Sequence, residues 1–173
     1  MTLLVLSVVG SDRPGLTRAL SAAVLSAGGN WLESRLSRLG GLYVGSVLVE
    51  LAAGGEEALR AAVRAVDAEG LEVRVAPAVE EADGGEGEAL KLSLVGQDRT
   101  GIVSQVTAVL SALGANIETF ETWVRPEAWS GAPLFHAEAR VRLPADLAAT
   151  KVQAALQDIS AEIMVDISVS SAA

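Results

Sequence analysis

The chain has 173 residues, half of them hydrophobic, and a formal net charge of −9 at pH 7. This length fits two small domains, and the hydrophobic content excludes a disordered chain. No segment is basic, which argues against direct binding to nucleic acid. The absence of cysteine excludes disulfides and thiolate chemistry.

The first half, residues 1–79, carries the pattern of a small α+β domain. Its expected elements are a strand at 3–9, a helix from Leu16 to Ala27, strands at 31–39 and 42–51, a helix around 59–66 and a strand at 71–75. The helix ends at GGN (28–30), and Gly40-Gly41 indicates a tight hairpin between the two middle strands. The order is βαββαβ.

Residues 80–89 are acidic and glycine-rich, and we expect them to form a linker. Residues 90–173 then repeat the order of the first half. The repeated elements include a strand at 90–95, a helix around 102–113, a strand at 134–143, a helix around 152–159 and a strand from Ile163 to Val169. The sequence therefore predicts two ferredoxin-like βαββαβ domains, each an antiparallel sheet with its helices on one face.

A turn motif, Gly-x-Asp-Arg-x-Gly, stands between the first strand and the first helix of both halves. It occurs in VVGSDRPGL (8–16) and again, 86 residues later, in LVGQDRTGI (94–102). One interpretation is structural: Pro14 suits a first helical position, and Asp12 can accept amide hydrogens at the helix start. The other is functional, because free amides at a helix start favour a small carboxylate or phosphate.

An asparagine follows each of these helices, Asn30 in the first half and Asn116 in the second. Each can act as a left-handed helix stop. Each can also offer a donor and an acceptor to an amino acid's carboxylate and ammonium groups.

The repeated turn and the Gly-x-Asn after the helix resemble the ACT domain, a regulatory module that binds amino acids or other small molecules. Two such domains without a catalytic or DNA-binding domain resemble the glycine cleavage system transcriptional repressor family. Two longer stretches, NWLESRLSRLGG (30–41) and SGAPLFHAEA (130–139), narrow the resemblance to that family. It covers almost the whole chain.

The resemblance implies that ACT domains pair side by side and bind a ligand between the first turn of one domain and strand residues of its neighbour. Carried over by position, the ligand-binding residues are Asp12, Arg13, Pro14, Gly15, Leu16 and Asn30, and then Asp98, Arg99, Thr100, Gly101, Ile102 and Asn116. Thr100 stands where the first copy has Pro14, so the two sites can differ in affinity.

The function implied is that of a non-enzymatic sensor of a small amino acid, with glycine as one candidate, that controls transcription through a partner factor. The alternative is a protein-interaction scaffold with no small-molecule ligand. Pairing within one chain and pairing across a homodimer are both open. We expect no cofactor and no metal, no membrane contact, and a cytoplasmic location, because no signal peptide or membrane span is evident.

Several other side chains are candidate site residues. His136 and Glu138 share one face of a strand, but a third metal ligand is not evident and a solvated polar face is the simpler interpretation. Glu33, Glu118 and Glu121 lie on or beside the second strands, where they can meet an ammonium group or remain solvated. Trp129, in the long loop at 125–133, is either a partner anchor or a cap on its own domain.

Overall fold

The computed structural model describes residues 1–68, 70–79, 87–128 and 130–172. The chain divides into two compact units, Met1–Glu80 and Glu81–Ala173, and each is described by itself. Most of the expected linker, residues 80–86, lies outside the described residues, as does Trp129. Residue 89, the last of that segment, begins a strand.

The first unit has the predicted order βαββαβ. Its elements are β1 (Thr2–Ser11), α1 (Leu16–Ser26), β2 (Asn30–Leu39), β3 (Leu42–Leu51), α2 (Glu56–Ala68) and β4 (Leu71–Pro77). Gly40 and Gly41 alone join β2 to β3, as the sequence predicted.

The second unit repeats the same order. Its elements are β5 (Ala89–Gln97), α3 (Ile102–Ala112), β6 (Asn116–Pro126), β7 (Pro133–Arg142), α4 (Ala149–Ile163) and β8 (Val165–Ser171). The last strand was expected to begin at Ile163, but that residue ends α4. It is buried, and it lies four residues after Ile159, which packs against the same core.

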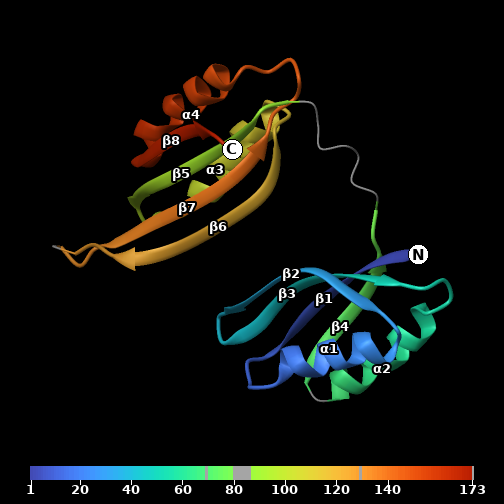
Figure 1. The fold of residues 1–173 in the computed structure, drawn as a ribbon. Helices are drawn as coiled ribbons and strands as arrows, with labels where there is room; N and C mark the ends of the chain where they lie inside the picture. Colours follow the sequence, from blue (N-terminus) through green and yellow to red (C-terminus); the bar gives the residue numbers. More distant parts are fainter. Residues whose placement is uncertain (69, 80–86, 129, 173) are drawn as a thin grey trace. The chain divides into compact units, whose positions relative to one another are not determined.

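Each unit contains one four-stranded antiparallel sheet, in the orders β2-β3-β1-β4 and β6-β7-β5-β8. Both helices of a unit cover the same face of its sheet (Figure 1). The predicted ferredoxin-like α+β fold is therefore confirmed for both halves.

Alternating side chains build each core. In β1, Leu4, Leu6 and Val8 are buried under the helices, whereas the residues between them face away from the helices. In β7 the buried side chains are Phe135, Ala137, Ala139 and Val141, as the sequence pattern predicted. The opposite face of β7 therefore carries His136, Glu138, Arg140 and Arg142.

A bulge occurs at the same place in the two edge strands. The register of β2 against β3 shifts between Trp31 and Glu33, and that of β6 against β7 shifts between Ile117 and Thr119. The extra residue in β6 is Glu118, so Thr119 rather than Glu118 pairs with Arg140 of β7. This local irregularity shapes the open face of the second sheet.

Candidate functional site

The two predicted turns have the same backbone conformation. Gly15 precedes α1 with φ 97° and ψ −7°, and Gly101 precedes α3 with φ 98° and ψ −7°. This left-handed conformation is readily adopted only by glycine. The final glycine of the repeated motif is thus explained by the backbone of each turn.

The amide groups that open both helices receive no side-chain cap. The first helical hydrogen bonds are donated by Ala19 N to Gly15 O at 2.9 Å and by Gln105 N to Gly101 O at 3.0 Å. The amides of the residues between donor and acceptor are the ones that a helix leaves for an outside acceptor. With the helix dipole, they favour an anionic group at this position.

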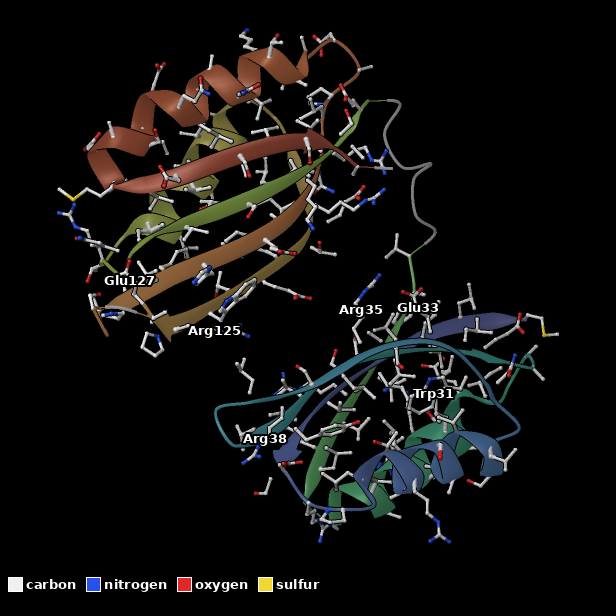
Figure 2. All side chains as sticks on the ribbon, turned by 60° about the vertical axis from the view of Figure 1, so that its left-hand side comes forward. Trp31, Glu33, Arg35, Arg38, Arg125 and Glu127 are labelled. Carbon is white, nitrogen blue, oxygen red and sulfur yellow. The ribbon has the colours of Figure 1, made fainter. Side chains whose placement is uncertain are left out.

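Asp12 does not cap α1, so that structural prediction was wrong. Its Oδ2 lies 3.2 Å from Nε of Arg38, at the hairpin end of β2 (Figure 2). The Asp12 amide also donates to Gly41 O at 3.4 Å. Both contacts hold Asp12 against the β2–β3 hairpin, on the sheet side of the turn.

Pro14 is not a helical residue, which corrects a second prediction. Gly15 is the N-cap and the helix begins at Leu16. Pro14 and its counterpart Thr100 are exposed in the turns. Each therefore lies next to the uncapped amides without using one of them as a cap.

Leu16 and Ile102 differ in kind from the rest of the predicted set. Each side chain is only 3% exposed and belongs to the hydrophobic core of its unit. These two residues therefore present a ligand with backbone groups and with little of their side chains.

A hollow of about 230 Å³ lies beside the second turn. It is lined by Arg99, Thr100 and Ile102 of the predicted set, and by Gln105, Glu162 and Ile163. We call it the turn hollow. Sequence reasoning missed Gln105, which lies on α3 three residues after Ile102, and Glu162, because only the fold brings the end of α4 to the start of α3.

Asn30 and Asn116 lie apart from the turns of their own units. They begin β2 and β6, whereas the turns precede α1 and α3, and each helix of 11 residues spans about 16 Å. Their predicted role as helix stops is also wrong, because the left-handed residues there are Gly28 and Gly114. Within one unit, the turn and its asparagine do not form a single site.

The three candidate glutamates have different surroundings. Glu118 accepts from Nε of Arg140 at 2.9 Å and from Nε of Arg142 at 2.8 Å. The hydrogen bond from Arg142 is the main cause that holds the pKa of the Glu118 carboxyl below its ordinary value, with Arg140 adding to it. Glu33 pairs with Arg35 at 2.9 Å, and Glu121 lines a cavity on the same sheet as Glu118.

Glu118→Gln should remove a contribution to stability that depends on pH. Because the arginines lower the pKa of Glu118 in the folded state, its contribution is present above the ordinary glutamate pKa of about 4.3 and is lost as pH falls through the lower folded value. Urea unfolding of both proteins at pH 7, 5, 4 and 3 should give a stability difference that shrinks toward zero at the acid end. A difference independent of pH would contradict the assignment.

His136 stacks on Trp123, with ring centroids 5.5 Å apart and an interplanar angle of 5°. In the part of the chain that the structure describes, no group of three or more His, Cys, Asp or Glu side chains forms a metal site.

Within the same residues, no helix has the length and apolar character needed to cross a bilayer.

Comparison with known proteins identifies the fold. The family model of the ACT domain matches residues 2–76. The crystal structure of an unknown protein from Galdieria sulphuraria is 32% identical to this chain, with a TM-score of 0.88 and 99% of each chain covered. No curated protein matches the chain.

A second solved structure is that of a protein proposed to be a glycine cleavage system transcriptional repressor. It is 16% identical, with a TM-score of 0.72, and the alignment covers 99% of this chain and 97% of that one. This likeness shows that the two proteins share the fold over both units. Residues 2–76 thus belong to the ACT domain family, and the second unit repeats its βαββαβ fold, so that the chain is a tandem ACT-like protein.

Proposed function

We propose that this chain is a non-catalytic regulatory protein that binds a small amino acid, with glycine as the first candidate, at the helix-start turns. Occupancy would control transcription through a partner factor. The observation that carries the proposal is the turn hollow beside the uncapped start of α3. ACT-domain membership of residues 2–76 supports it independently.

The lining of the turn hollow suits an amino acid at both of its charged ends. The Arg99 guanidinium and the free helix amides are donors for a carboxylate, and the dipole of α3 adds to that preference. Glu162 supplies a carboxylate for an ammonium group, and Gln105 supplies both a donor and an acceptor. The turn of the first unit repeats the backbone and the Asp-Arg pair, with Pro14 in place of Thr100.

We place Asn30 and Asn116 in sites completed by a neighbouring domain. Since α1 and α3 separate each asparagine from the turn of its own unit, the twelve predicted residues can converge only where the turn of one domain meets the start of β2 or β6 of another. That neighbour belongs either to the same chain or to a second copy in a homodimer. A ligand held between two domains favours the arrangement in which both parts of the site are present.

The proposal of indirect control follows from charge. The net charge of −9 and the lack of any basic segment leave no source of affinity for DNA phosphates. The fold shared with a protein proposed to be a glycine cleavage system transcriptional repressor makes transcription the first process to test. A partner protein must then carry the contact with DNA.

Thermal unfolding in the presence of each of the twenty amino acids tests the sensor. A ligand at about 100 times its dissociation constant should add about 2.7 kcal/mol, a rise in Tm of about 5–10 °C at this chain length. Arg99→Met should weaken binding by about tenfold to a hundredfold, because a charge-assisted hydrogen bond contributes about 1.5–3 kcal/mol. The Arg13→Met Arg99→Met double variant should lose the response at both turns.

Arg64→Met is the matched control, since Arg64 is exposed on α2 and belongs to neither turn. It should respond as the unchanged protein does. An unchanged response in the double variant would show that the turns are not the site. A lack of response to every amino acid at millimolar concentration would favour the interaction scaffold.

A further inference from the structure

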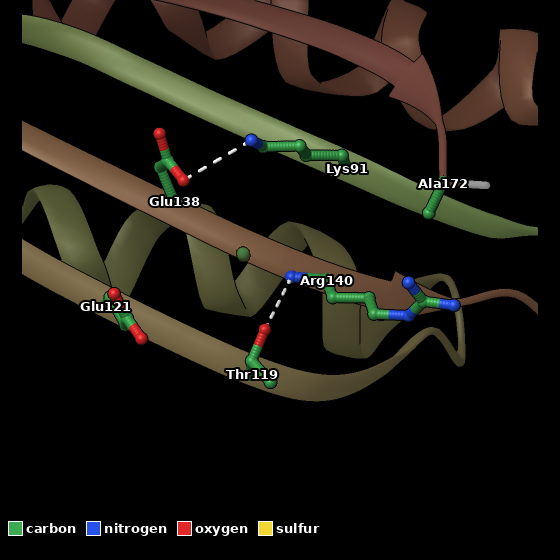
Figure 3. Close-up of a pocket in the computed structure, with 7 residues that line it drawn as sticks. Lys91, Thr119, Glu121, Glu138, Arg140 and Ala172 are labelled. Carbon is green, nitrogen blue, oxygen red and sulfur yellow. Dashed lines mark hydrogen bonds and ion pairs between the residues drawn. The ribbon is translucent and has the colours of Figure 1, made fainter.

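The open face of the second sheet holds a cavity that is separate from the turn hollow. Its volume is about 230 Å³, and we call it the sheet cavity. It is lined by Lys91, Thr119, Glu121, Glu138, Ala139, Arg140 and Ala172 (Figure 3). Lys91 lies near the start of β5 and the Asp98 turn follows its end, so about 20 Å of extended chain separates the two features.

One end of the sheet cavity is acidic. Glu121 and Glu138 are direct partners across β6 and β7, and Figure 3 shows both carboxylates at the same end of the cavity. Lys91 Nζ lies 3.4 Å from Glu138 Oε2, whereas Glu121 has no ion pair among the residues that the structure describes. Like charges directly opposite each other on a sheet destabilise it, and a bound ammonium group would remove that cost.

The other end carries an excess of positive charge. Arg140 and Arg142 share the single carboxylate of Glu118 through their Nε atoms. The Arg140 guanidinium, which extends away from Glu138 in Figure 3, has five N–H donors. It therefore retains donors for a second acceptor.

We propose that the sheet cavity binds a small zwitterion, with its ammonium group at Glu121 and Glu138 and its carboxylate at Arg140. Glu138 and Arg140 are two residues apart on β7, which sets their Cα atoms about 7 Å apart. Because the Arg140 side chain extends away from Glu138 (Figure 3), the two charged groups lie farther apart than that, and the ligand must bridge the difference. The cavity volume of about 230 Å³ is well above the space that a single water molecule needs. This site does not depend on the proposed function of the turns.

An NMR titration of the full chain tests the site. The probes are glycine, β-alanine and γ-aminobutyrate, which place the two charges at increasing distances, with methylamine and acetate as single-charge controls. At least one zwitterion should shift the amides of residues 119–121 and 138–140 with an affinity about tenfold or more above that of either single-charge probe. The chain length of the zwitterion that binds most tightly reports the distance between the acidic and basic ends of the sheet cavity.

Glu121→Gln should weaken the binding of that zwitterion about tenfold. The matched Glu57→Gln, at an exposed position of α2, should bind as the unchanged protein does. Arg99→Met should leave the response of the sheet amides intact, because Arg99 lines the turn hollow.

Three outcomes would overturn the sheet cavity as a zwitterion site. The first is a set of shifts confined to residues 12–16 and 98–102, which would leave the turn proposal standing. The second is equal binding of the zwitterions, methylamine and acetate. The third is full affinity in Glu121→Gln.

Discussion

Gly96→Ala should lower the free energy of unfolding by about 3 kcal/mol, because no space exists for the added methyl group. A Cβ atom at Gly96 would lie 2.4 Å from the carbonyl oxygen of Met164 and 2.7 Å from Cα of Val165. Both atoms belong to the backbone where β8 begins, so a side-chain rotation cannot relieve the clash. Gly10 has the same relation to Gly70 O, at 2.4 Å.

Two further variants separate this clash from other effects of losing a glycine. Gly101→Ala adds a Cβ that contacts no atom within 4 Å, but the backbone of residue 101 has φ 98°. Conformational strain alone should therefore cost about 1–2 kcal/mol. Ser93→Ala, on the same strand as Gly96, should change stability by about 0.5 kcal/mol or less. Denaturant unfolding should show the largest loss of stability for Gly96→Ala, a smaller one for Gly101→Ala and the smallest for Ser93→Ala. A smaller loss for Gly96→Ala than for Gly101→Ala would contradict the close approach.

The close approach also bears on the site. Gly96 stands two residues before Asp98, and Gly10 two residues before Asp12. Because the backbone of the last strand is held against these glycines, the chain leaves the sheet at a fixed place in both units. The first glycine of the repeated motif is therefore explained by packing, and the last by the left-handed turn.

The architecture was predictable because its signals are local. Alternation along 134–143 indicated which face of β7 is buried, and Gly40-Gly41 indicated the hairpin. Ile163 was misplaced because its spacing fits two patterns: it continues the helical series from Ile159 and also alternates with Val165. The residue that ends the helix is Met164, with φ 53°, and sequence patterns assign such positions to glycine or asparagine.

The details of the site were less predictable because they depend on tertiary partners. Asp12 has the residue type and position expected of a helix cap, but Arg38, 26 residues later, holds its carboxylate at the hairpin. Glu162 has no motif of its own, and only the packing of α4 against α3 brings it to the turn hollow. The pairing of Glu118 with Arg140 and Arg142, 22 and 24 residues later, likewise leaves no signal in the local pattern.

Ile102→Ala and Leu16→Ala should each reduce stability by about 3 kcal/mol, within the range of about 2–5 kcal/mol for truncating a buried aliphatic side chain. Both side chains are 3% exposed and pack in the core from the first residue of their helices. Since the side chains point into the core, only the backbone amides of these residues face the turns. The variants should therefore unfold at lower denaturant concentration with an unchanged m-value.

Val103→Ala is the control for this prediction, because Val103 is the next residue of α3 and is 41% exposed. It should change stability by about 0.5 kcal/mol or less. Ligand titration below the unfolding transition then separates backbone from side-chain recognition: if the amides hold the ligand, folded Ile102→Ala retains an affinity within about threefold of the unchanged protein. A large loss of affinity together with normal stability would instead place the Ile102 side chain in contact with the ligand, and would contradict its burial in the core.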